Sequence, residues 1–178
     1  KGGPVSNNNI LIFYSDSTDA RTRKRIQQLI NAGRCVTGIG FSRIRYNSFV
    51  KPFWKDYQIG TSKDGKYFAR FGRFLLQYFR LLSFLSKRLK SNRLNAVYVI
   101  NLDMLLMYLL VSVMFKCSPK IYYEVADIHP LLTKNSFLSR VLRKIEKFLV
   151  EFTVFKIVTT SIGFQSEYFN KLNVMFDF

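Results

Sequence analysis

Cysteine and histidine are scarce in this sequence, and their scarcity argues against two kinds of site. There are two cysteines and one histidine among 178 residues. Cys35 and Cys117 lie far apart, with no CxxC motif and no histidine nearby, which disfavours a zinc site and a disulfide framework. Both cysteines stand in apolar runs, so we expect buried free thiols in a reducing compartment, and no metal site.

A membrane-spanning run and a signal peptide are also missing. The longest apolar run, Met104 to Phe115, is interrupted by Ser112 and falls short of the roughly 20 residues that cross a bilayer. The opening KGGPVSNNN has no apolar core of the signal-peptide kind. We therefore expect a soluble or peripheral protein. Residues 1–9 are predicted to be a flexible N-terminal segment or a cloning remnant, and residues 10–178 a single domain.

Acidic residues are few, and this leaves a large positive charge. The chain has 28 lysines and arginines against 11 acidic residues, a formal net charge of +17. Such an excess implies a polyanionic partner, which charge alone leaves open as nucleic acid, an anionic membrane face or phosphorylated substrates. Because 48% of the residues are apolar and 16% aromatic, the chain is predicted to fold around a core.

Apolar runs alternate with helical patterns along the chain. The runs predict strands at 10–14, 34–41, 57–59, 96–100, 120–125 and 156–160. The 3-4 spacing of apolar residues predicts helices at 20–33, 67–93, 102–115, 138–152 and 164–172. This alternation predicts an α/β fold with a Rossmann-like, doubly wound, mainly parallel sheet and helices on both faces.

The strand at 120–125 ends in a short polar elbow that holds Asp127 and the only histidine, His129. Ligands of open α/β sheets bind beyond the carboxyl ends of the strands, which favours a functional role for this pair. A turn aspartate and a hydrogen-bonded loop histidine explain the two residues equally well. No Ser-His-Asp order and no metal-ligand spacing accompanies them, so the pattern supports neither triad hydrolysis nor metal catalysis.

Polar residues follow three other predicted strands. The first strand leads to the candidate ligand-binding residues Ser15, Asp16, Ser17 and Thr18. The loop has no GxGxxG and no Walker lysine, but it adjoins a helix N-terminus, where an anion or a hydroxylated ligand binds well. Capping of the helix by Thr18 or Asp19 is the plain alternative. Asn101 and Asp103 follow the strand at 96–100, and Ser161 follows the one at 156–160.

The predicted helix at 67–93 joins an apolar stripe to basic residues and contains no acidic residue. The candidate membrane-binding residues are Arg70, Arg73, Arg80, Phe84, Lys87 and Arg88. Packing of the stripe on the sheet, with the charges in water, is the plain interpretation. Uncompensated charge beside Phe84 favours an interfacial helix on an anionic bilayer. Because no helix-turn-helix, RNP pair or KH loop is present, we prefer a membrane surface to nucleic acid as the partner.

Four segments resemble, in order and spacing, the N-terminal domain of family 4 glycosyltransferases of the GT-B fold. DARTRKRIQQLINAGRCVTGIG at 19–40 resembles the first crossover, and NAVYVINLD at 95–103 resembles the Asp-Val-Val-His strand. IYYEVADIHP at 121–130 resembles the Tyr-Asp-x-His-Asp segment, and KIVTTSIGFQSEYF at 156–169 the Val-Ile-x-x-Ser strand with its helix. The resemblance spans most of the chain and implies one half of a GT-B fold.

Such enzymes move a sugar from a nucleotide-sugar donor to an acceptor, often a lipid-linked one. The resemblance implies that His129 faces the reacting sugar and that Asn101, Asp127 and Ser161 line the same cleft. The loop at 15–18 matches the acceptor-side loop but lacks the paired glycines common in the family. No cofactor is implied beyond the nucleotide sugar as co-substrate.

The family's second domain, which grips the donor and carries a Glu-x7-Glu motif, is not found in this sequence. Our hypothesis is therefore the acceptor-binding, membrane-associating half of a hexosyltransferase that builds a cell-surface polysaccharide. It would be cytoplasmic and peripheral on the inner face of the plasma membrane, with the donor domain in cis or on a partner subunit. The alternatives are a non-catalytic partner that recruits a separate catalytic subunit to the membrane, or a basic nucleic-acid-binding α/β domain.

Overall fold

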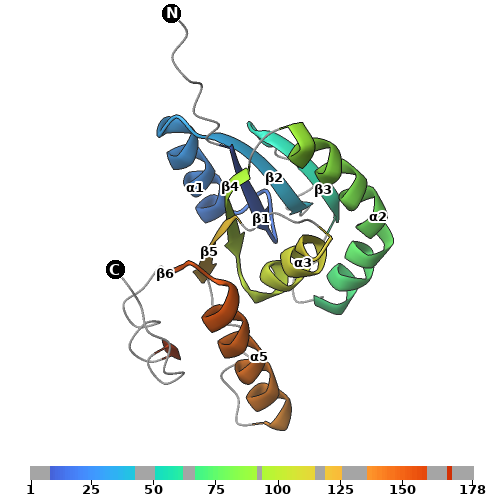
Figure 1. The fold of residues 1–178 in the computed structure, drawn as a ribbon, viewed down its shortest axis with the longest axis vertical. Helices are drawn as coiled ribbons and strands as arrows, with labels where there is room; N and C mark the ends of the chain where they lie inside the picture. The colour runs from blue at the N-terminus through green and yellow to red at the C-terminus, as the bar shows by residue number, and fades with distance from the viewer. Residues whose placement is uncertain are drawn as a thin grey trace, which may run out of the picture.

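A six-stranded sheet, with every neighbouring pair parallel, forms the centre of the fold (Figure 1). The computed structural model describes residues 9–42, 51–61, 67–91, 94–114, 119–125, 136–159 and 168–169, and within 67–91 the side chains of 71–86. The strands are β1 (Asn9–Tyr14), β2 (Cys35–Ser42), β3 (Lys55–Thr61), β4 (Leu94–Ile100), β5 (Lys120–Val125) and β6 (Lys156–Thr159). Their order is β3-β2-β1-β4-β5-β6, the Rossmann order, so the predicted fold class is confirmed.

Helices cover both faces of the sheet. They are α1 (Ala20–Asn31), α2 (Tyr67–Ser91), α3 (Leu102–Ser112) and α5 (Phe137–Thr153). Figure 1 shows α1 on one side of the sheet and α2 with α3 on the other. The packing agrees, because Ile26 of α1 packs with one core, whereas Phe74 of α2, Met104 of α3 and Val150 of α5 share the second.

Strand β1 explains why its run of apolar residues shows no alternation. Leu11 and Phe13 point into the core under α2 and α3, while Ile12 and Tyr14 point into the core under α1. All four side chains are buried because helices cover both faces of a central parallel strand. The glycine at position 40 on β2 makes room for Tyr14, since a Cβ there would lie 2.1 Å from the Tyr14 carbonyl oxygen.

Helix α1 begins and ends where its capping residues predict. The Asp19 carboxylate accepts a hydrogen bond from the Thr22 backbone N–H, with an N–O distance of 2.9 Å. Gly33 follows the helix with a φ of 71°, a left-handed conformation that glycine adopts without strain. Asp19, one of the two caps considered, therefore sets the start of the helix that follows the β1 loop.

Three predictions about single segments differ from the structure. Cys35 is exposed and not buried, because it is the first residue of β2, before the strand enters the core. Strand β1 begins at Asn9, one residue inside the predicted flexible segment, and β3 extends well beyond 57–59. Of the helix predicted at 164–172, only residues 168–169 lie in the described part of the chain. Among the helices that the structure describes, none is long and apolar enough to cross a bilayer.

Candidate functional site

The loops after β1 and β4 lie side by side at the carboxyl edge of the sheet. Phe13 of β1 pairs with Val99 of β4, so the two strands end next to each other. The chain order reverses between these strands, and ligands of Rossmann-like sheets bind at such a switch point. The structure therefore brings together the predicted loop at 15–18 and the predicted residues Asn101 and Asp103.

The β1 loop is held in one shape by its own side chains. The Asp16 carboxylate accepts hydrogen bonds from the Thr18 backbone N–H at 2.9 Å and from the Thr18 hydroxyl at 2.7 Å. The Ser17 backbone N–H donates to the Phe41 carbonyl of β2 at 2.8 Å. Asp16 and Ser17 are buried, whereas Ser15 and Thr18 are half-buried. Asp16 thus forms the turn, and Ser15 and Thr18 are the members of the loop that solvent reaches.

Asn101, directly after β4, has a strained backbone. Its φ of 72° and ψ of 159° belong to a region that is essentially limited to glycine, and a non-glycine residue there costs about 1–3 kcal/mol. Its backbone N–H donates to the Glu124 carbonyl on β5 at 2.9 Å, which holds this conformation in place. Asp103 lies two residues on, in the first turn of α3. Strain of this kind clusters at ligand sites, so Asn101 is the strongest local sign of function.

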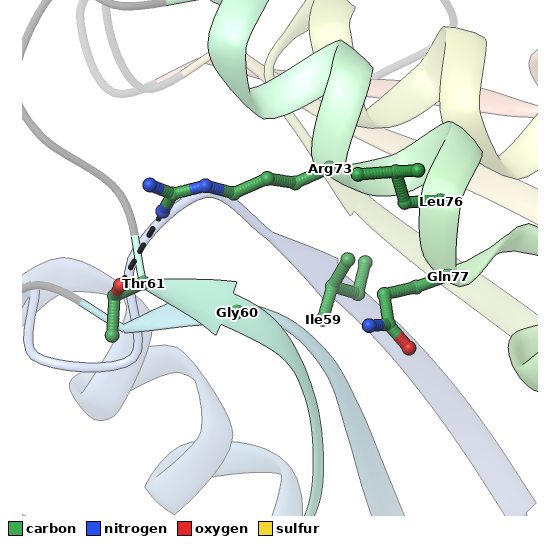
Figure 2. A pocket seen from close by; sticks show the side chains of 6 residues that line it. All are labelled: Ile59, Gly60, Thr61, Arg73, Leu76 and Gln77. Atoms are coloured by element: carbon green, nitrogen blue, oxygen red, sulfur yellow. Dashed lines mark hydrogen bonds between the residues drawn. The ribbon is translucent and has the colours of Figure 1, made fainter.

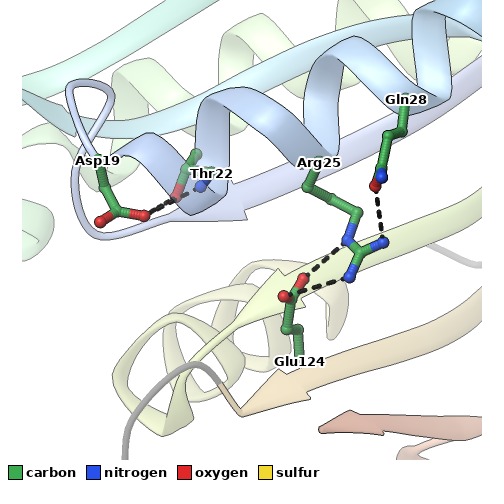
Figure 3. A network of polar contacts seen from close by, with 5 residues as sticks. All are labelled: Asp19, Thr22, Arg25, Gln28 and Glu124. Carbon is green, nitrogen blue, oxygen red and sulfur yellow. Dashed lines mark hydrogen bonds and ion pairs between the residues drawn. The ribbon is translucent and has the colours of Figure 1, made fainter. Parts of the chain in front are cut away.

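A buried ion pair supports the same edge of the sheet (Figure 3). Arg25 of α1 donates from Nε to the Glu124 carboxylate at 3.1 Å and from Nη2 at 3.4 Å. Its Nη1 donates to Gln28 at 3.0 Å, and its guanidinium lies 5.6 Å from the Tyr98 ring centroid. The pair joins α1 to β5 and neutralises a carboxylate whose side chain is only 4% exposed. Sequence reasoning missed it, although a glutamate in the apolar run IYYEV was a visible signal.

A second polar group lies under α1 between β1 and β3. The Tyr14 hydroxyl donates to Asp56, and the Trp54 indole N–H donates to the Tyr14 oxygen at 3.4 Å. Burial raises the pKa of the Asp56 carboxyl above its usual range, against the hydrogen bonds that lower it. Arg23 covers the Trp54 ring at 5.4 Å from its centroid. The sequence pattern did not predict this group, which fastens β3 to the centre of the sheet.

A third polar group ties α5 to β5. Glu146 of α5 is 1% exposed, and its two carboxylate oxygens accept hydrogen bonds from Tyr123, at 2.8 Å, and from Tyr168. Burial raises the pKa of the Glu146 carboxyl, and the two phenol donors oppose that shift. Because each carboxylate oxygen has a donor, the group is a satisfied structural tie. Sequence reasoning did not single out this glutamate, because its partners Tyr123 and Tyr168 come from other parts of the chain.

Three predicted site residues, Asp127, His129 and Ser161, lie outside the described residues. Their roles remain predictions. The end of β5 is nevertheless described, and Tyr123 of β5 pairs with Val99 of β4. The elbow therefore starts from the strand next to Asn101. Within the described part of the chain, no group of three or more histidines, cysteines or acidic residues could hold a metal ion.

The described members of the predicted membrane-binding set on α2 are two exposed arginines and one half-buried phenylalanine. Arg73 and Arg80 are exposed. Phe84 is not: it is half-buried and stacks on Tyr57 of β3, with 4.5 Å between ring centroids, because it lies on the flank of the helix that faces the sheet. The side chains of Arg70, Lys87 and Arg88 lie outside the described part.

Leu76 and Phe79, and not the predicted Phe84, are apolar residues of α2 that point outward. Leu76 is 82% exposed and Phe79 is 79% exposed, and both lie on the same outer surface as Arg80. The helical pattern alone could not identify them, because apolar residues surround most of this helix and only the packing on β3 shows which side is covered.

A hollow of about 270 Å³ lies between the sheet edge and α2 (Figure 2). Its lining residues are Ile59, Gly60, Thr61, Arg73, Leu76 and Gln77. Arg73 extends along β3, and its Nη1 donates to the Thr61 hydroxyl at 3.3 Å. Sequence reasoning placed Arg73 on a membrane-binding helix but did not foresee this hollow, which forms only where α2 passes over the edge strand.

Comparison with known proteins finds a similar protein but no matching family. No family model matches the chain. The succinoglycan biosynthesis protein ExoL of Rhizobium meliloti (strain 1021) is 29% identical over 171 residues, which cover 92% of this chain and 40% of that protein. The chain thus spans about 40% of the length of the curated relative that it matches. The name of that protein assigns it to the biosynthesis of succinoglycan.

Proposed function

We propose that this chain is the acceptor-side half of a glycosyltransferase of family 4 and the GT-B fold, acting in the synthesis of a cell-surface polysaccharide. The observation that carries the proposal is the strained Asn101 beside the rigid β1 loop at the switch point of a Rossmann-order sheet. The similarity to a succinoglycan biosynthesis protein supports the substrate class. The reaction moves a hexose from a nucleotide sugar to a lipid-linked acceptor.

The polar groups at this edge suit a saccharide. Ser15, Thr18 and Asn101 are half-buried, and their uncharged hydroxyl and amide groups are of the kind that hydrogen-bonds sugar hydroxyls. The Thr18 hydroxyl donates to Asp16, so it faces a ligand as an acceptor. In this proposal His129, which follows β5 in the sequence, hydrogen-bonds the transferring sugar. The donor domain, in cis or on a partner subunit, holds the nucleotide.

An anionic membrane surface is the second partner in this proposal. Most of the exposed large apolar side chains belong to the helices on one face of the sheet or directly follow them: Phe71, Leu75, Leu76 and Phe79 from α2, Leu110, Val113 and Met114 from α3 and its end, and Phe137, Leu138, Ile145, Phe148 and Phe152 from α5. On the other face, α1 exposes only alanine and polar or charged side chains. This asymmetry, with arginines and lysines beside the apolar groups, favours docking on the inner face of the plasma membrane.

The transfer reaction tests the site. Membranes that contain the protein carrying this chain are incubated with labelled nucleotide sugars, and label in the lipid fraction is measured. Asn101→Gly keeps the backbone conformation and removes the amide, so we expect kcat/KM to fall at least about tenfold, or 1.4 kcal/mol. The matched control is Asn31→Ala on the exposed end of α1, which should transfer at the wild-type rate. Unimpaired transfer by Asn101→Gly and His129→Ala would contradict the assigned site.

Binding assays separate the proposal from its rivals. Vesicles with anionic lipid should pellet the protein, whereas RNA at physiological salt should not shift it. The reverse result favours a nucleic-acid-binding domain. Wild-type transfer by both site variants, with vesicle binding intact, favours a non-catalytic recruiting partner.

A further inference from the structure

The hollow between β3 and α2 has one charged group and no opposing charge. Arg73 provides the only charge among the lining residues, and one of its five N–H donors points to Thr61. Neither α2 nor the lining contains an acidic residue. Among the described residues, the remaining guanidinium donors have no acidic partner, and the ligand that matches their planar fork is a phosphate or a carboxylate.

The rest of the lining limits what the anion can be attached to. Gln77 and Thr61 add polar groups, whereas Ile59 forms an apolar floor and Leu76 an exposed apolar rim (Figure 2). At about 270 Å³ the hollow is smaller than the roughly 300–1,000 Å³ of pockets that enclose drug-sized ligands. It is suited to a compact anionic group with a short apolar continuation along Leu76, and it is too small to enclose a nucleotide sugar.

We propose that this hollow binds a phosphate group, with Arg73 as the charge partner, Gln77 and Thr61 as neutral hydrogen-bonding groups, and Leu76 as the contact for an adjoining apolar chain. The phosphate belongs to a lipid headgroup or to a free phosphate compound. The lipid source rests on the proposed membrane association of α2, while phosphate binding itself does not. The carboxyl edge of β1 and β4 is a separate site.

A pair of arginines on the same helix makes the test specific. Arg73→Gln and Arg80→Gln each remove one exposed positive charge from α2, but Arg80 does not line the hollow. The purified chain is titrated with inorganic phosphate and with short-chain phosphatidic acid by amide chemical-shift changes. Pelleting is compared on phosphatidylcholine vesicles that carry either phosphatidic acid or oleate, at matched surface potential. Circular dichroism checks that both variants fold.

We expect Arg73→Gln to weaken binding of inorganic phosphate and of phosphatidic acid about tenfold, the loss of one charge-assisted contact of about 1.4 kcal/mol. In solution, Arg80→Gln should change neither by more than a small factor, because Arg80 does not line the hollow. On vesicles both variants lose one of the proposed membrane-binding charges, so only an additional loss in Arg73→Gln on phosphatidic acid reports the hollow. Leu76→Ala should weaken phosphatidic acid binding alone. Tighter binding of phosphatidic acid than of inorganic phosphate identifies the lipid as the source, and equal binding identifies free phosphate.

Equal losses in the two arginine variants would overturn the proposal, because Arg73 would then act as one charge among many. Absence of phosphate binding by the wild-type chain would overturn it as well. Neither result affects the sugar-transfer test at Asn101. Conversely, a failed transfer test leaves the contrast between Arg73→Gln and Arg80→Gln intact.

Discussion

Removing Arg25 leaves the Glu124 carboxylate buried without its partner. We expect this to be among the most destabilising substitutions at partly exposed positions of the chain. The Glu124 side chain is 4% exposed and receives two hydrogen bonds from the guanidinium, at 3.1 and 3.4 Å. Arg25→Met keeps an aliphatic side chain of similar length and removes the guanidinium, with its charge and its contacts to Glu124, Gln28 and the Tyr98 ring. The change therefore tests the polar contacts of the guanidinium more than the packing of the aliphatic stem.

The magnitude follows from the burial of the two partners. Breaking a buried pair by removing one partner costs about 3–5 kcal/mol. Since the Arg25 side chain is 31% exposed, water can reach the orphaned carboxylate, so we expect the lower end, about 3 kcal/mol. Glu124→Gln leaves a positive charge that water can solvate and should cost about 1.5 kcal/mol. The double variant should cost less than the sum of the two single variants.

Urea unfolding at neutral pH measures these differences, with Lys147→Met as the control. Lys147 pairs with Glu151 one turn along α5 at 3.6 Å, and both side chains are 37% exposed, so its loss should cost no more than about 0.5 kcal/mol. If Arg25→Met costs as little as Lys147→Met, the pair does not hold α1 to β5 in the way argued above.

Three further predictions concern backbone conformation and a buried acid. Gly40→Ala places a Cβ 2.1 Å from the Tyr14 carbonyl oxygen and should lower the free energy of unfolding by at least about 3 kcal/mol. Gly72→Ala, in open space on α2, should raise the free energy of unfolding by about 1 kcal/mol. Urea unfolding measures both changes. Asn101→Gly should raise the unfolding free energy by about 1 kcal/mol through relief of strain, and an unchanged or lower value would show that the conformation is not strained. Glu146→Gln removes a buried carboxyl group. Burial raises the pKa of this group above its ordinary value of 4.5. The folded state thus binds this proton more tightly, and the resulting stabilisation is complete below pH 4.5 and lost as pH rises through the folded pKa. Over that rise the free energy of unfolding of the wild type should fall relative to that of the variant, by at most about 1.4 kcal/mol per pH unit. Parallel pH profiles of the two proteins would contradict this.

The sequence by itself determined the elements and the fold class. Continuous apolar runs such as ILIFY predict strands covered on both faces, and Asp19 and Gly33 mark the ends of α1 through local backbone chemistry. Polar residues after the strands, among them Asn101, predict where a ligand edge lies, because parallel strands place their carboxyl ends together. The inferences about the elements and the fold class succeed because each depends on neighbours in the chain, whereas the ligand edge stays a prediction.

Only the tertiary structure decided which long-range partners meet. The pair Arg25 and Glu124 is separated by 99 positions, and nothing in either local pattern indicates the other. Phe84 looked outward by helical spacing, but packing on β3 turns that flank of α2 inward. The strain at Asn101 likewise arises from the contact with β5. Such features depend on how the helices pack on the sheet, because this packing brings together residues that are far apart in the sequence.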